Sequence, residues 1–164
     1  EVKNKNEPNG GKFASATALF AIIGSKDYNA ITLPGNAAVA PEAFAKVYFN
    51  ETEKIAYFDG TGLPKAPVGK VYQVWSLKLD PLTPTSVGLL GSISENDIGI
   101  FKFENIPDPE AFGITLEPEG GSESPTLSQL YTLGTGLLAI NVVSCWLNIL
   151  ILGSCISSNV NSSS

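Results

Sequence analysis

Short segments in which apolar and polar residues alternate run through most of the chain. The clearest are Val71–Leu79 and Phe112–Glu117, because alternation with a period of two is typical of a half-buried β-strand. Further segments of the same kind are Asn29–Leu33, Ala43–Phe49, Lys54–Phe58, Thr85–Ser92, Ile98–Phe103 and Leu127–Leu133. Stretches rich in Gly, Pro, Asn and Asp separate them, among them an expected hairpin loop at Asn50–Glu53 and a turn at Asp80–Pro84.

This pattern predicts an all-β fold, an antiparallel Greek-key β-sandwich of about eight strands, because strands follow one another without the helices of βαβ units. A short N-terminal helix is expected within Phe13–Gly24, where helix-forming residues end at a glycine. The chain then divides into a lead-in at residues 1–27, a sandwich domain at 28–134 and an uncharged apolar tail at 135–164.

The strand Val71–Leu79 carries its apolar residues on one face, with Trp75 and Leu77 among them, and Gln73 falls on that same face. If Gln73 is buried, its amide needs hydrogen-bond partners, since an unsatisfied buried polar group costs about 1–3 kcal/mol. We expect Gln73 to be a structural residue with such partners.

The segment Leu137–Leu152 is nearly all apolar, and no charged residue follows Glu123. Three interpretations are open: additional sandwich strands, a membrane-associated segment, or foreign sequence that does not belong to the domain. The short length of Leu137–Leu152 and its polar residues argue against a segment that crosses the whole membrane. Cys145 and Cys155 lack the spacing of a redox or zinc motif, and either a disulfide or two free thiols fits them.

Composition excludes several functions. The formal net charge of −6 argues against a nucleic-acid partner. The chain has no histidine, which removes Ser–His–Asp and Cys–His nucleophile pairs and histidine zinc sites. Methionine is also absent and the chain begins at Glu1, so we expect a fragment or a processed form.

Candidate catalytic groups are few. Glu117, Glu119 and Glu123 form an acidic cluster, and we expect all three to be solvated on an exposed turn rather than paired across a cleft. The segment Asp59–Gly62 lacks the Gly-Lys-Ser/Thr ending of a phosphate-binding loop. The hydroxyl residues of Ser122–Thr126 have no base to activate them. The sequence therefore predicts no enzyme, no cofactor and no metal site.

Two stretches carry a family resemblance. GLPKAPVGKVYQVW (Gly62–Trp75), the small-residue turn Ser86–Val87–Gly88, and FGITLEPEGGSESPT (Phe112–Thr126) together resemble the C-terminal domain of anti-sigma-K factors, in this order and at similar separations. The resemblance covers roughly 28–134. Its signature residues, expected to be structural, are Leu63, Pro64, Gly69, Tyr72, Gln73, Trp75, Gly88, Thr115, Glu117, Pro118, Gly120, Gly121, Ser122, Pro125 and Thr126.

The resemblance implies an extracytoplasmic sensor or regulatory domain of a membrane-anchored bacterial anti-sigma factor. In that family a cytoplasmic domain binds an ECF-type sigma factor, one membrane helix follows, and regulated proteolysis releases the sigma factor. The cytoplasmic domain and the membrane helix are expected upstream of this chain. The helix would tether this extracytoplasmic domain to the bacterial inner membrane. The alternative is a free-standing secreted or periplasmic β-sandwich that acts as a binding module.

Overall fold

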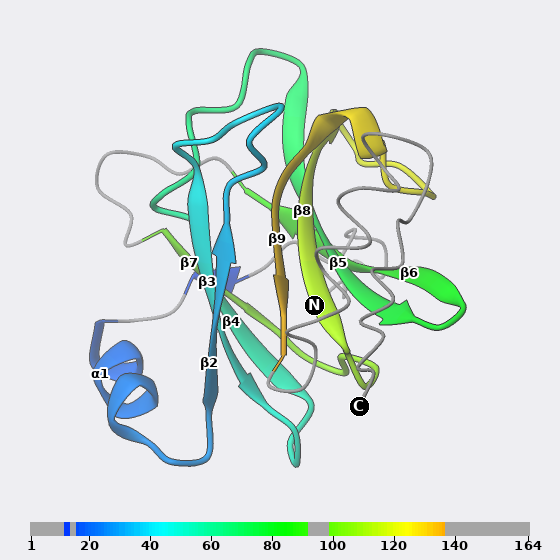
Figure 1. The fold of residues 1–164 in the computed structure, drawn as a ribbon. Coiled ribbons are helices and arrows are strands. Elements are labelled where there is room, and N and C mark those ends of the chain that lie inside the picture. The colour runs from blue at the N-terminus through cyan, green and yellow to red at the C-terminus, as the bar shows by residue number, and fades with distance from the viewer. Residues whose placement is uncertain (1–11, 14–15, 92–98, 137–164) are drawn as a thin grey trace, which may run out of the picture.

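The computed structural model describes residues 12–13, 16–91 and 99–136, and its described part folds into two antiparallel sheets packed face to face (Figure 1). The first, the β2 sheet, has the order β1 (Lys12–Phe13), β7 (Ile100–Phe103), β4 (Ile55–Asp59), β3 (Phe44–Asn50) and β2 (Asn29–Pro34). The second, the β5 sheet, has the order β6 (Leu82–Leu90), β5 (Lys70–Leu79), β8 (Ala111–Pro118) and β9 (Leu130–Thr135).

This topology confirms the predicted all-β antiparallel sandwich. β4 lies beside β7, and β5 lies beside β8, although neither pair is consecutive in the chain. The chain crosses from one sheet to the other between β4 and β5, between β6 and β7, and between β7 and β8. Crossings of this kind are typical of β-sandwiches with Greek-key connections. They bring β5 and β8, which are far apart in sequence, into the centre of one sheet.

The core lies between the sheets and follows from the alternation within each strand. In β3, Ala45, Val47 and Phe49 are buried while the residues between them are more exposed. β8 supplies Phe112, Ile114 and Leu116 from the other sheet. The rings of Phe58 and Phe112 meet edge to face, with centroids 5.3 Å apart, which is a favourable geometry for aromatic pairs.

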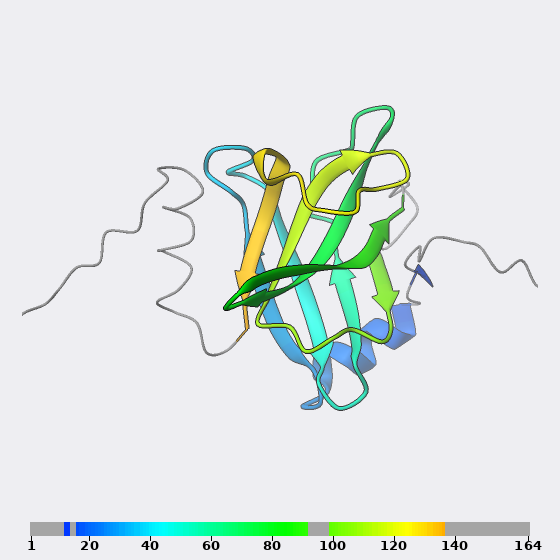
Figure 2. The ribbon, with the colours of Figure 1, turned by 90° about the vertical axis from the view of Figure 1, so that its right-hand side faces the viewer.

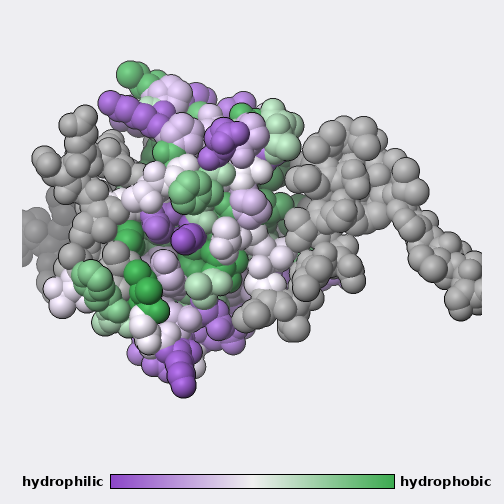
Figure 3. Space-filling model, turned by 60° about the vertical axis from the view of Figure 1, so that its left-hand side comes forward, coloured by the Kyte–Doolittle hydropathy of each residue, from purple (hydrophilic) through white to green (hydrophobic). Residues whose placement is uncertain are grey.

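The expected N-terminal helix is present as α1 (Ala16–Gly24), beside the lower end of the β2 sheet (Figure 2). Ile22 is buried, whereas Phe20 and Ile23 are 78% and 57% exposed. Across the described ranges, no helix is long and apolar enough to cross a membrane. Figure 3 brings the left-hand side of Figure 1 forward. Hydrophilic and hydrophobic residues are mixed over this face.

Two predicted elements differ from the structure. The strand expected at Leu127–Leu133 begins as a 3₁₀ turn, η1 (Leu127–Gln129), and only then continues as β9. The turn expected at Asp80–Pro84 is shorter, because β6 begins at Leu82 and Pro84 pairs with Leu77. β6 is an edge strand, and proline, which has no N–H to donate, is tolerated in edge strands.

The edge strands β2 and β9 close one side of the sandwich, and we call their contact the β2–β9 seam. Gly35 and Thr132 form an isolated antiparallel bridge. The amide of Asn36 donates to the Tyr131 carbonyl at 2.8 Å, and its side chain donates to the Leu130 carbonyl at 3.0 Å. Further along, β9 passes so close to β2 that a Cβ at Gly134 would lie 2.4 Å from the Thr32 carbonyl oxygen.

Candidate functional site

The two stretches that carry the sequence resemblance meet in the centre of the β5 sheet. β5 and β8 pair antiparallel, with Gln73 opposite Thr115 and Trp75 opposite Gly113. These residues lie on the outer face of the sheet, the face turned away from the sandwich core. The loop that follows β8 folds back over this face, so that residues from both stretches contact one another.

Glu117 is the centre of this arrangement, because its side chain is 0% exposed. Its Oε1 accepts hydrogen bonds from the Thr115 hydroxyl at 2.5 Å and from the Thr126 amide at 2.8 Å. Its Oε2 accepts from the Ser122 hydroxyl at 2.8 Å and from the Thr126 hydroxyl at 2.7 Å. The expectation that all three acids of this turn are solvated is therefore wrong for Glu117, whereas Glu119 and Glu123 are exposed.

The donors to Glu117 are all neutral. The ion pairs found in the described ranges lie elsewhere and join Lys54 to Asp108, Lys78 to Glu110 and Lys102 to Glu104. Burial acts to raise the pKa of Glu117, but the hydrogen bonds donated by Thr115, Thr126 and Ser122 outweigh it and hold that pKa below its ordinary value. The carboxyl group therefore stays ionised at neutral pH.

This environment is unsuited to general acid–base catalysis by Glu117 near neutral pH. A general acid or base near neutral pH needs a pKa close to 7, and the pKa of Glu117 is shifted in the opposite direction. Each carboxylate oxygen already accepts two hydrogen bonds, which leaves little capacity for a substrate or a cation. Among the residues that the structure describes, no group of three or more His, Cys, Asp or Glu side chains could hold a metal ion.

Trp75 and Gln73 extend the network from β5. The indole Nε1 of Trp75 donates to the Thr115 hydroxyl at 2.9 Å, and this hydroxyl in turn donates to Glu117. The Gln73 side chain is 3% exposed and donates through Nε2 to the Ser86 hydroxyl and the Ser122 carbonyl, at 2.8 and 3.0 Å. Its Oε1 accepts from the Ser122 amide at 2.8 Å. Gln73 thus has the partners that its burial requires.

The apolar face predicted for β5 is thus the outer face, and the sandwich core is built from the opposite face. Tyr72 and Val74 belong to the core, whereas Trp75 lies under the loop. Both faces of β5 and β8 are buried near their centres, as the burial patterns of the two strands show. Alternation in the sequence separates the two faces but does not say which of them meets the other sheet.

The backbone of the loop depends on two glycines. Gly120 and Gly121 have φ angles of +95° and +84°, a region that side chains other than glycine rarely adopt. The Gly121 amide donates to the Pro118 carbonyl at 2.8 Å, and the Glu119 amide donates to the Gly69 carbonyl at 3.0 Å. A Cβ at Gly121 would lie 2.9 Å from Gln73 Oε1, so the turn packs directly on the network.

The remaining signature residues surround the network. The Tyr72 hydroxyl donates to the Pro64 carbonyl at 2.9 Å, and the neighbouring Leu63 packs against the core. Gly88 pairs with Val74 at a β-bulge, where the register of β5 and β6 shifts. Pro125 lines an apolar groove on the outer face of the β5 sheet. The structure therefore gathers most of the signature around β5 and β8, where these residues hold the loop on the sheet.

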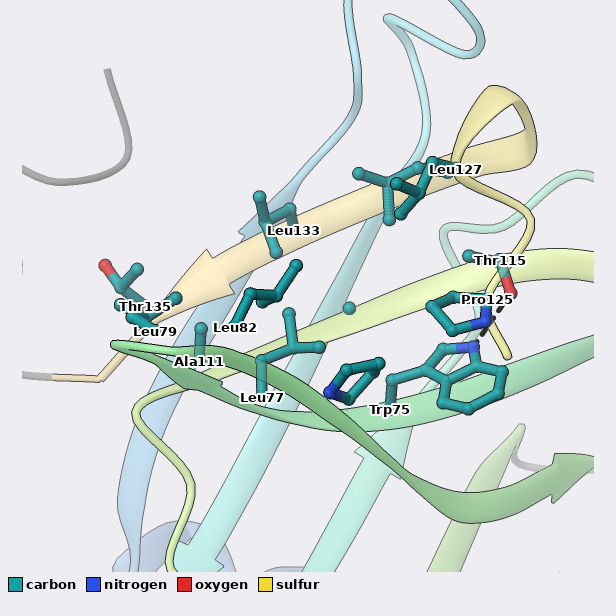
Figure 4. A pocket seen from close by; sticks show the side chains of 13 residues that line it. Trp75, Leu77, Leu79, Leu82, Ala111, Thr115, Pro125, Leu127, Leu133 and Thr135 are labelled. Atoms are coloured by element: carbon teal, nitrogen blue, oxygen red, sulfur yellow. Dashed lines mark hydrogen bonds between the residues drawn. The ribbon is translucent and has the colours of Figure 1, made fainter. Parts of the chain in front are cut away.

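An apolar groove crosses the outer face beside the loop (Figure 4). In Figure 4 the side chains of Leu77, Leu82 and Leu133 point toward one another across it. The groove was not predicted from the sequence, because its walls come from four strands and the loop. Its lining residues are Trp75, Leu77, Leu79, Leu82, Pro84, Ala111, Gly113, Thr115, Pro125, Leu127, Leu130, Leu133 and Thr135.

Comparison with known proteins identifies relatives of the chain. It is 33% identical over 84 residues to a protein of Streptomyces griseus named "Uncharacterized protein in phr 5'region". This alignment covers 51% of the chain and 34% of the relative, so the chain spans about a third of that protein's length. No solved structure matches the chain.

The family model described as "Anti-sigma-K factor rskA, C-terminal" matches residues 6–130, most of the chain. The match includes both stretches that meet around Glu117 and confirms the resemblance found in the sequence. Anti-sigma factors are regulatory proteins whose partners are proteins such as sigma factors. The chain belongs to the family of anti-sigma-K factor C-terminal domains.

Proposed function

We propose that this chain is the extracytoplasmic regulatory domain of a membrane-anchored anti-sigma factor, and that it acts through protein contacts rather than catalysis. In this proposal a helix upstream of the chain crosses the inner membrane, and a cytoplasmic domain further upstream binds an ECF-type sigma factor. Regulatory proteases cut the anti-sigma factor in response to a signal, and the sigma factor is released.

The family match is the observation that carries this proposal. The site geometry supports it, because the side chains of Gln73, Trp75 and Glu117 are engaged in internal hydrogen bonds that hold a loop on a sheet. The alignment covers 34% of the relative from Streptomyces griseus, so that protein is about three times as long as the aligned segment. This is expected if the chain is one domain of a longer protein. That length favours the anchored protein over a free-standing binding module.

The location can be tested with a cysteine at Val68, whose exposure of 105% leaves it fully open to solvent. Val68→Cys is introduced into the full-length gene product in its native host, with Cys145 and Cys155 replaced by serine. A membrane-impermeant maleimide is expected to label Val68→Cys in intact cells. Labelling only after the cells are lysed would contradict an extracytoplasmic location.

The regulatory role is tested by loosening the domain in the full-length protein. Glu117→Gln is compared with Gln129→Ala, a change at the end of η1 whose side chain donates to the Ser128 carbonyl and not to Glu117. We expect Glu117→Gln to alter both the cleavage pattern on an immunoblot and the transcription controlled by the cognate sigma factor, while Gln129→Ala matches the wild type. If Glu117→Gln destabilises the purified domain but changes neither readout, regulation through this domain is refuted.

A further inference from the structure

The groove on the outer face of the β5 sheet is an apolar surface without a partner among the residues that the structure describes. No charged side chain lines it. Leu82 and Leu127, which lie on its border, are 36% and 43% exposed. Exposed contiguous apolar surface is unfavourable in water and commonly marks a contact site.

The chain leaves the described domain beside this groove. Thr135, the last residue of β9, lines the groove, and the Gly136 amide donates to the Glu110 carbonyl at 3.1 Å, which fixes the exit point. The next residue begins the segment Leu137–Leu152. A segment attached at this point is held at a high effective concentration near the groove, because its binding is intramolecular.

The composition of that segment matches the groove. Leu137–Leu152 has no charged residue, and its side chains are apolar except for Asn141, Ser144 and Asn148. The groove along β5, from Trp75 to Leu79, is about 13 Å long at roughly 3.3 Å per residue. Even after a reversing turn of about four residues, the segment is long enough to cover it.

We propose that Leu137–Leu152 docks in cis on this groove and covers the outer face of the β5 sheet. The docked segment removes Leu77, Leu82 and Leu127 from water, and the hydrophobic effect is its driving force. A sheet with one face in the core thereby has its second face covered by two pieces of the same chain, the loop after β8 and the segment after β9.

The test measures the accessibility of thiols placed in the groove of the full-length chain. Cys145 and Cys155 are replaced by serine, and a single cysteine is introduced as Leu77→Cys or, on the exposed edge strand, Leu82→Cys. The labelling rate by a maleimide is compared between the native segment and one carrying Leu147→Asn, Ile149→Asn and Ile151→Asn. Val68→Cys, at an exposed position that is not among the lining residues of the groove, serves as the control.

A segment docked nine-tenths of the time slows labelling about tenfold. We expect this protection at both groove positions with the native segment, loss of it with the polar segment, and no change at Val68→Cys. Equal rates with both segments would overturn the proposal. Protection that increases with protein concentration would assign the groove to a second copy, and protection that appears only with phosphatidylcholine vesicles would assign it to lipid. Either result would also overturn docking in cis.

Discussion

Gln73 and Ser122 exchange a pair of hydrogen bonds in which the Gln73 side chain acts like the backbone of a neighbouring strand. The Ser122 amide donates to Gln73 Oε1 at 2.8 Å, and Gln73 Nε2 donates to the Ser122 carbonyl at 3.0 Å. The two residues are 49 positions apart in sequence. This pair connects the loop after β8 to the centre of β5. The Ser122 backbone bonds a side chain of β5 there instead of the backbone of a strand.

Removal of the Gln73 amide should therefore release the loop. Gln73→Ala leaves the backbone of Ser122 without its partners, and we expect it to lower the free energy of unfolding by about 1–3 kcal/mol. Chemical denaturation followed by circular dichroism measures the loss. Gln129→Ala is the matched control, because it removes a side chain that donates to the adjacent Ser128 carbonyl and should change stability by less than about 0.5 kcal/mol. Equal losses in the two variants would contradict the role of this pair.

The Glu117 carboxylate should stabilise the domain at neutral pH. Glu117→Gln keeps the size of the side chain but replaces one acceptor oxygen by a donor facing hydroxyl and amide groups. Because hydrogen bonds to a charged group are the stronger kind, we expect a loss of about 2–4 kcal/mol at pH 7. A Glu119→Gln control, at an exposed acid of the same turn, should be close to neutral.

The same carboxylate predicts a pH dependence of stability. Its pKa lies below the ordinary value of 4.5 in the folded protein, so its stabilising contribution is present above that pH and is lost as the pH falls through the folded pKa. The gap in unfolding free energy between wild type and Glu117→Gln should therefore narrow on acidification below about pH 4.5. A gap that stays constant from pH 7 to about pH 3 would show that ionisation of Glu117 is not its source.

Two buried threonines on neighbouring strands should respond in opposite ways to the same substitution. Thr115 and Thr132 are both 0% exposed, but the Thr115 hydroxyl joins Trp75 to Glu117, whereas the Thr132 hydroxyl has no hydrogen-bond partner in the described ranges. Thr115→Val should cost about 2–3 kcal/mol, and Thr132→Val should be neutral or stabilising by about 1 kcal/mol. Thermal unfolding midpoints compare the two variants, and a similar loss in both would refute this assignment.

The two glycines of the turn form another matched pair. An alanine at Gly120 meets open space and carries only the strain of its positive φ angle, about 1 kcal/mol. An alanine at Gly121 has similar strain and also collides with Gln73 Oε1, which cannot move without losing its bond to Ser122. Gly121→Ala should therefore cost about 1–2 kcal/mol more than Gly120→Ala. Denaturant midpoints of the two variants measure the difference, and equal values would contradict the close packing of the turn.

The sequence was sufficient to predict the strands, because period-two alternation is local and appears in β3, β5 and β8 without knowledge of the fold. It also showed that Gln73 needs partners. It failed at Glu117, because alternation places this residue on the outer face and only the return of the loop buries that face. Four hydroxyl residues lie within ten positions of Glu117, and this was the available signal; three of them, Thr115, Ser122 and Thr126, bond its carboxylate. The groove could not be predicted, since its walls come from strands that are distant in the chain.

The β2–β9 seam has a mechanical consequence. The two strands run antiparallel, so the start of β2, near Ile31, lies beside the end of β9, near Gly136. A pulling force that reaches β2 from upstream and β9 from downstream therefore acts at the same end of the seam. Its contacts, from Gly134 against Thr32 to Asn36 with Tyr131, would be loaded one after another rather than together. Under tension this side of the sandwich would unzip, while the Glu117 network on the central strands of the β5 sheet would carry little of the initial load.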